Sequence, residues 1–126
     1  MNLLPIADYL KLQYPMLPIF VHHMPETVET GVLLRIDLPG AKCYPEIPNY
    51  RRGDFLMVIR DADPGKGYRL ASEIAKLLTW RGPRALDRTF KVMQCVPLRD
   101  PIPYPETAGD YIEFAVEFRI HFVDES

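Results

Sequence analysis

Three histidines and two cysteines are the side chains of this chain best suited to bind a metal ion or attack a substrate. His22 and His23 are adjacent, and in a strand they would point to opposite faces, so the two cannot chelate one ion together. Structural metal sites use several ligands at close spacing, and we expect none here. A Cys43–His23 pair would suit a thiol nucleophile, but a loop cysteine without a catalytic role is the favoured interpretation.

Other segments only partly match catalytic motifs. Residues 64–67, Pro-Gly-Lys-Gly, lack the glycine spacing and the Lys-Ser/Thr pair of a phosphate-binding loop, so we predict a turn into a helix. Glu113 and Glu117 fall on the polar side of an alternating segment, where solvent exposure alone would explain them. These segments therefore predict no reaction.

A basic cluster surrounds the single tryptophan, and its members are Trp80, Arg81, Arg84, Arg88 and Lys91. Such a cluster could touch phosphate groups or stack a nucleic-acid base. The favoured interpretation is that Trp80 packs at the end of a helix under the following loop. Any contact with DNA would then be made by basic residues that line or rim the surface next to the DNA, without recognition of the base sequence.

The chain has 126 residues, 48% of them apolar and 25% charged, as expected for one globular domain spanning residues 1–126. No apolar run approaches the roughly 18 to 20 residues that cross a bilayer. Residues 1–12 carry Asp8 and have no basic flank before their apolar residues, so we predict neither a secretory signal nor membrane association. Cys43 and Cys95 are expected to be free thiols, because a chain of this length does not need a disulfide.

Charge changes sign along the chain. The net charge of −2 gives no gross attraction to nucleic acid or to an anionic membrane. Residues 51–99 nevertheless carry +6, whereas residues 1–50 carry −2 and residues 100–126 carry −6. Two interpretations stay open: solvated faces that differ in sign, or a basic surface of one copy that meets an acidic surface of the next. A contact of the second kind is head-to-tail and closes into a ring when its rotation allows.

The 13 prolines outline the regular elements, because proline is excluded from helix interiors and central strands. Prolines cluster in residues 39–48 and 97–105, which predicts two long, stiffened loops with a binding role. Residues 111–122 alternate between apolar and polar side chains, which is typical of a strand with one buried face. Residues 32–38 alternate similarly, and 55–59 form an apolar run typical of a central strand covered on both faces.

Two further strands and two helices complete the prediction. Residues 90–96 and, more weakly, 19–23 favour strands. A first helix is expected over residues 3–14, and a second from the N-cap Asp63 and from Pro64 to about Trp80. The order helix, three strands, helix, two strands predicts an α+β fold, with a mostly antiparallel four- to five-stranded sheet packed against two helices.

Several segments together resemble the tail terminator proteins of long-tailed bacteriophages, also called minor capsid or tail completion proteins. They are residues 46–55 (Glu-Ile-Pro-Asn-Tyr-Arg-Arg-Gly-Asp-Phe), 58–60 (Val-Ile-Arg), the helix with Ala71, Ile74, Ala75 and Leu78, residues 97–103 (Pro-Leu-Arg-Asp-Pro-Ile-Pro) and the closing strand 110–123. The resemblance covers residues 30–123, contains no catalytic signature and is compatible with the first helix.

This resemblance implies a small α+β structural protein that is not an enzyme and needs no cofactor. Such proteins assemble as a ring, commonly of six copies, on the last ring of the tail tube, where they stop polymerisation and offer a surface to the filled head. The expected partners are further copies of the chain, the tail tube protein and the head–tail connector or neck proteins, with incidental contact to passing genome DNA. The expected location is the head-proximal end of the virion tail, and the host cytoplasm before assembly.

The candidate contacts with subunits or with the tail tube are our own inference from residue type and place. Tyrosine and arginine are enriched at interface hot spots. The candidates in the two proline-rich loops and at their ends are Tyr50, Arg51, Arg52, Asp54, Arg99, Asp100, Tyr104 and Glu106. For each of them, a loop residue that serves only its local backbone remains the alternative.

Three other functions stay open. A head-completion or neck protein of the same virion could share this size and ring habit, but it would leave tail length normal. A small binding module and a thiol enzyme are the remaining alternatives, and Cys43 or His23 would matter to the last of them.

Overall fold

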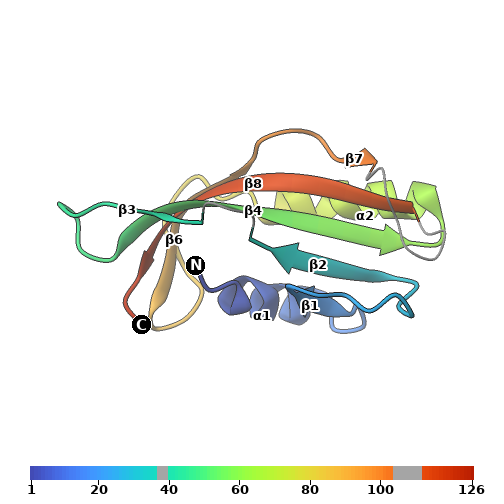
Figure 1. Cartoon of the computed structure of the whole chain (residues 1–126), viewed down its shortest axis with the longest axis horizontal. Coiled ribbons are helices and arrows are strands. Elements are labelled where there is room, and N and C mark those ends of the chain that lie inside the picture. The colour runs from blue at the N-terminus through green and yellow to red at the C-terminus, as the bar shows by residue number, and fades with distance from the viewer. Residues whose placement is uncertain (37–39, 104–111) are drawn as a thin grey trace.

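The computed structural model of the protein describes residues 1–36, 40–103 and 112–126. Its elements in chain order are α1 (Leu4–Gln13), β1 (Ile19–Val21), β2 (Gly31–Arg35), β3 (Lys42–Cys43), β4 (Tyr50–Asp61), α2 (Pro64–Leu77), β5 (Arg84–Ala85), β6 (Phe90–Pro97), β7 (Ile102–Pro103) and β8 (Ile112–Asp124). The described residues thus form an α+β fold with two helices, as predicted (Figure 1).

The sheet is larger than predicted, and it is mixed. Its eight strands follow the order β1-β2-β4-β8-β6-β5, with β3 paired to β4 and β7 paired to β8. β1 and β2 are parallel, whereas the other pairs are antiparallel. The expected four to five strands were too few because β3, β5 and β7 have two residues each, which is too short for an alternation pattern.

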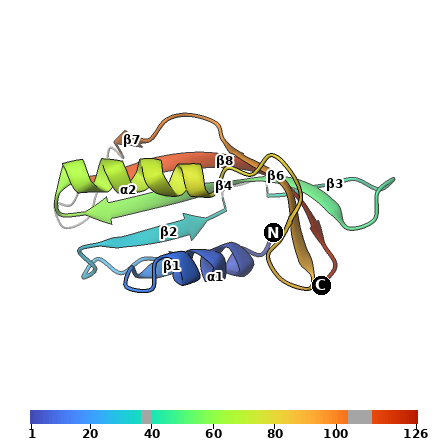
Figure 2. The same cartoon turned by 180° about the vertical axis from the view of Figure 1, so that it is seen from behind.

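A long two-stranded ribbon of β4 and β8 forms the centre of the sheet. Its antiparallel register runs without a shift from Tyr50 opposite Val123 to Asp61 opposite Ile112. Neighbouring strands cover only parts of it, since β2 pairs with β4 from Leu56 to Arg60 and β3 pairs with β4 at Arg51 and Arg52. Residues 42–52, which we call the arm, project beyond both helices at one end of the ribbon (Figures 1 and 2).

Both helices pack on one face of the sheet (Figure 2). α2 begins as predicted, with Pro64 in its first turn and the Asp63 carboxylate accepting a hydrogen bond from the Gly65 N–H at 2.9 Å. α1 begins one residue later than predicted, at Leu4, and ends at Gln13. The Tyr14 hydroxyl donates to Glu73 Oε1 at 2.7 Å and so joins the end of α1 to α2. No helix among the described residues is long and apolar enough to cross a membrane.

The core lies between the helices and the inner sheet face. The rings of Phe55 and Phe118 stack across β4 and β8 with centroids 5.0 Å apart, and the rings of Phe90 and Phe122 stack across β6 and β8 at the same distance. Alternation in β4 and β8 directs these rings inward. The same alternation sends every second residue of the ribbon to the outer face, which is the face opposite the helices.

Candidate functional site

Three of the predicted interface residues share the outer face at the root of the arm. Tyr50, Arg52 and Asp54 are alternate residues of β4, so their side chains point to the same side. Their partners across the ribbon on β8 are Val123, His121 and Arg119. Arg51 has the opposite parity, and its Nη1 donates to the Tyr50 carbonyl at 3.2 Å.

A chain of contacts holds the arm onto β8. Lys42 Nζ lies 5.3 Å from the centroid of the Tyr44 ring, and the Tyr44 ring packs edge-on against the Tyr50 ring at 5.2 Å. The Tyr50 hydroxyl lies 2.8 Å from His121 Nδ1. These contacts link the arm, with its basic residues, to β8. Sequence reasoning missed His121 and Tyr44, because strand pairing brings His121 to residue 52 and a turn brings Tyr44 to Tyr50.

Partial burial and the charges around His121 favour its neutral form. Partial burial, then the positive charges of Arg52 and Arg119, lower the pKa of His121, and Asp54 opposes them. A neutral imidazole is compatible with the short contact to the Tyr50 hydroxyl, because one of the two groups donates and the other accepts.

Asp54 has a partner within its own chain. Arg119 Nε donates to Asp54 Oδ1 at 3.0 Å, and Arg119 Nη2 donates to Oδ2 at 3.2 Å. Both side chains remain about two-fifths exposed, so the pair lies on the surface and is screened by solvent. The Asp54 carboxylate therefore accepts hydrogen bonds from Arg119 of the neighbouring strand β8, while its side chain remains on the outer surface.

The other predicted residues lie elsewhere. Arg99 and Asp100 follow β6 and line a hollow beside α2 together with Tyr68 and Lys76. The nearby Leu98 N–H bonds to the Glu117 carbonyl, in the middle of β8, whereas the arm meets β8 near His121. The eight candidates are thus not one site, and Tyr104 and Glu106 lie outside the described residues.

The end of the ribbon opposite the arm contains a buried ion pair. Arg60 Nε donates to Glu113 Oε2 at 2.9 Å, and the two side chains are only 6% and 8% exposed. The expectation that solvent exposure alone explains Glu113 was wrong, because Glu113 is buried and paired with Arg60. The pair was not foreseen because the two residues lie 53 positions apart in sequence. Arg60 Nη1 also donates to the carbonyls of Pro25 and Val28, at 2.8 and 3.0 Å, and so holds the β1–β2 connection.

Trp80 packs inside the molecule, as the favoured interpretation predicted. Its backbone pairs with Cys95, and its ring meets the Tyr9 ring edge-on at 5.3 Å. The Arg84 guanidinium lies 4.9 Å from the Tyr9 centroid and 5.5 Å from the Trp80 centroid. Because Trp80 is only 9% exposed, its face does not offer a platform for a nucleic-acid base.

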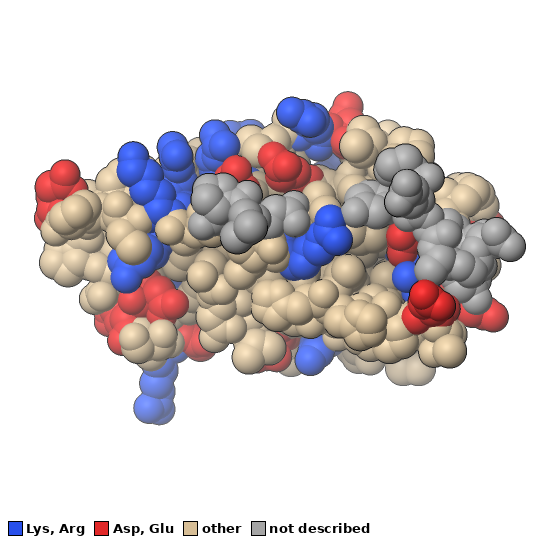
Figure 3. Space-filling view, viewed as in Figure 1, with Lys and Arg blue, Asp and Glu red and all other residues tan. Residues whose placement is uncertain are grey.

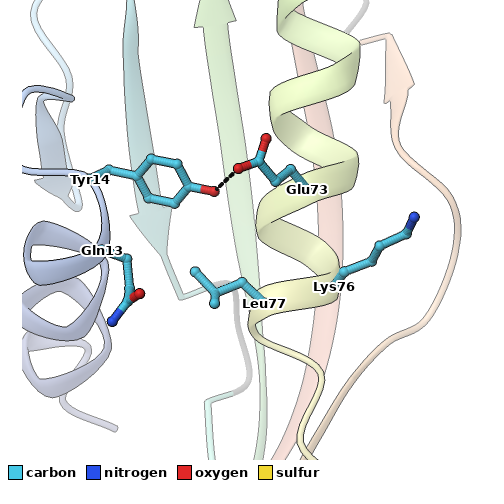
Figure 4. Close-up of a pocket in the computed structure, with 5 residues that line it drawn as sticks. All are labelled: Gln13, Tyr14, Glu73, Lys76 and Leu77. Atoms are coloured by element: carbon cyan, nitrogen blue, oxygen red, sulfur yellow. Dashed lines mark hydrogen bonds between the residues drawn. The ribbon is translucent and has the colours of Figure 1, made fainter.

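A second hollow lies between the helices and is lined by Gln13, Tyr14, Glu73, Lys76 and Leu77 (Figure 4). The Tyr14–Glu73 hydrogen bond crosses it. Burial, then the hydrogen bond to Glu73 and its charge, raise the pKa of Tyr14 to about 12, so the hydroxyl stays protonated and donates. This geometry ties the helices together and presents no activated nucleophile.

The two thiols differ strongly in their surroundings. Cys95 is buried in the core and burial raises its pKa to about 12, whereas Cys43 is exposed in β3. Within the described ranges, no three His, Cys, Asp or Glu side chains are grouped so that they could hold a metal ion.

No family model and no curated protein matches this chain. One solved structure, whose name states no function, aligns with 94% of this chain and 89% of its own at 17% identity and a TM-score of 0.43. A structural likeness of this strength supports no statement about family or function.

Proposed function

We propose that this chain is a structural protein of phage assembly that caps the polymerised tail tube as a ring and provides the surface onto which the head docks. The proposal rests on the resemblance of residues 30–123 to tail terminator proteins. The observation that supports it best is the arm, which places Tyr50 and Arg52 on an outward, ordered surface at one end of the molecule.

Side chains of this kind suit a protein contact. Tyrosine and arginine bury large areas at modest entropy cost and are common at interface hot spots. The Lys42–Tyr44–Tyr50–His121 contacts hold the surface in place before any partner binds, and such order reduces the entropy lost on association. The proposed partners are further copies of the chain, the tail tube protein and the head–tail connector, without a cofactor.

A tail terminator has two tasks that require two different surfaces. It must bind the tube end more tightly than another tube subunit does, and it must present an outer face that no tube subunit can use. The molecule has two dissimilar ends, with a projecting arm at one and a buried ion pair beneath a short connection at the other. This asymmetry suits a subunit that makes different contacts in different directions.

Electron microscopy of a lysate from the source phage or prophage with this gene disrupted tests the proposal. Tails of uncontrolled length, unattached to filled heads, are the expected result. Normal-length tails beside separate, complete heads would assign the chain to the neck, and intact infectious particles would contradict both roles. Complementation with Cys43→Ser should restore normal tails, since the proposed role does not use a thiol, whereas a thiol enzyme would lose activity.

A further inference from the structure

The arm carries a basic surface. Three of its four charged side chains are Lys42, Arg51 and Arg52, and the fourth, Glu46, lies in the turn. Lys42 lies opposite Arg52 in the β3–β4 pair, so the two share the outer face, and Arg51 neighbours them on the other face. Basic side chains gather on the outer face at the β3 end of the molecule (Figure 3).

The opposite end of the ribbon carries an acidic surface, which we call the acidic end. Its members are Glu26, Glu29, Asp61 and Asp63, and the basic Lys66 and Arg69 lie beside them in the first two turns of α2. Glu26 and Glu29 are exposed in the β1–β2 connection, where Arg60 holds the carbonyls of the flanking Pro25 and Val28. The buried Arg60 thus holds the backbone that carries the two exposed glutamates.

The two surfaces cannot neutralise each other within one copy. Arg52 and Asp61 are nine positions apart in the extended β4, which corresponds to roughly 30 Å. That distance exceeds the Debye length of about 8 Å at physiological salt. Charges this far apart interact only weakly within one copy, whereas a second molecule can bring the two surfaces into contact.

Each end also has an exposed isoleucine. Ile47 in the turn of the arm is 50% exposed, and Ile112, opposite Asp61 in the ribbon, is 44% exposed. Protein interfaces combine an apolar centre with a polar, charged rim. Both ends therefore have the composition of an interface, and their charges are complementary.

We propose that the arm of one copy docks on the acidic end of a second copy, with Lys42 and Arg52 facing Glu26 and Glu29 and with Ile47 beside Ile112. The contact is head-to-tail, so each copy uses both surfaces, and the chain of copies closes into a ring when the rotation per copy allows. The inference rests on the proposed function, which requires a ring, and it names the surfaces that build it.

Charge reversal with complementation tests this contact. Sedimentation velocity on the full chain compares the arm variant Lys42→Glu/Arg52→Glu with the end variant Glu26→Lys/Glu29→Lys. Each variant alone should associate about a hundredfold more weakly, because like charges then face each other. An equimolar mixture should recover the assembly, since the reversed arm of one variant meets the reversed end of the other. Assembly of either variant alone as in the wild type, a mixture that stays dissociated, or a wild-type chain that remains a monomer at about 100 μM would overturn the proposal.

Matched controls separate the contact from net charge and from folding. Arg81→Glu/Arg88→Glu changes the charge by the same amount at exposed arginines outside both surfaces, and it should leave assembly unchanged. Ile47→Asp should weaken association about tenfold, whereas Leu12→Asp, at a 78% exposed position on α1, should not. Equal loss in a variant and in its control would count against the proposed surfaces, and circular dichroism would show that all of these variants fold.

The inference and the proposed function fail in different ways. Variants that behave as expected, combined with normal tails after gene disruption, would keep the contact and reject tail termination. Uncontrolled tails after disruption, combined with variants that assemble normally, would keep tail termination and reject the contact.

Discussion

The ion pairs Arg60–Glu113 and Asp54–Arg119 are formed by residues directly opposite each other in the same two strands, β4 and β8. Their N–O distances are nearly equal, 2.9 and 3.0 Å, but the first pair is 6% and 8% exposed and the second 41% and 42%. A buried charge that loses its partner is strongly destabilising, whereas an exposed pair contributes little. Position along one ribbon therefore decides whether an ion pair is buried and holds the fold or lies on the surface in contact with solvent.

The largest difference between the two pairs should appear when the buried cation is removed. Arg60→Ala should lower the free energy of unfolding by about 3 to 5 kcal/mol, because Glu113 stays buried without this partner and the β1–β2 connection loses two hydrogen bonds. Urea unfolding followed by circular dichroism measures the loss. The double variant Arg60→Met/Glu113→Leu should recover most of it, and wild-type stability in the single variant would refute the assigned role.

A smaller effect should show that one acidic residue at the same end is also structural. Asp63→Ala should reduce the free energy of unfolding by about 1 kcal/mol, since the Gly65 N–H then loses its N-cap acceptor. Asp63→Asn is the matched control and should behave nearly like the wild type, because asparagine caps helices equally well. Urea midpoints compare the three proteins. Equal losses in both variants would mean that the charge of Asp63 matters and that its capping does not.

At the arm, the expected effect is a modest dependence of stability on pH. The pKa of His121 is lowered in the folded protein, so the unfolded chain binds more protons below about pH 6.5. Stability should therefore decline as the pH falls from that value through the folded pKa, and this decline should then level off. Unfolding free energies of wild type and His121→Asn at about pH 7.5 and pH 5.5 isolate the contribution. If acidification lowered the free energy of unfolding less in the wild type than in His121→Asn, the predicted direction of the pH dependence would be wrong.

The smallest effect should come from the exposed pair itself. Arg119→Ala should leave the urea midpoint unchanged within error, because Asp54 regains water when its partner is removed. Asp54→Asn is the companion variant, with the same expectation. A loss comparable with that of Arg60→Ala would abolish the contrast between the two ends.

Elements with long, regular patterns could be predicted from the sequence. The alternation over residues 111–122 identified β8, which runs from Ile112 to Asp124, and Asp63-Pro64 located the start of α2. Both signals are local, since they depend on strand pleating and on helix capping. The start of β4 at Tyr50, which puts Tyr50, Arg52 and Asp54 on one face, was not predicted, because residues 50–54 do not alternate and the expected strand covered only residues 55–59.

Features that depend on pairing between distant segments could not be predicted. Alternation shows that Glu113 shares a face with Glu117, but not that Arg60 lies opposite it and that the site is buried. The parallel direction of β1 has no signal in the local sequence. β7 contains Pro103, and although proline is tolerated at the edge of a sheet, the prolines of this segment predicted a loop. His121 joined the arm only through its register with Arg52.

The uninterrupted pairing of β4 with β8 has a mechanical consequence. Hydrogen bonds in an antiparallel ribbon run perpendicular to the strands, so a pull on the arm along β4 loads the whole stretch from Tyr50 to Asp61 in shear. These bonds must then yield together instead of opening one after another from the end. A force applied at the arm is thereby carried as tension through the full length of the ribbon and into the layer of helices packed on it.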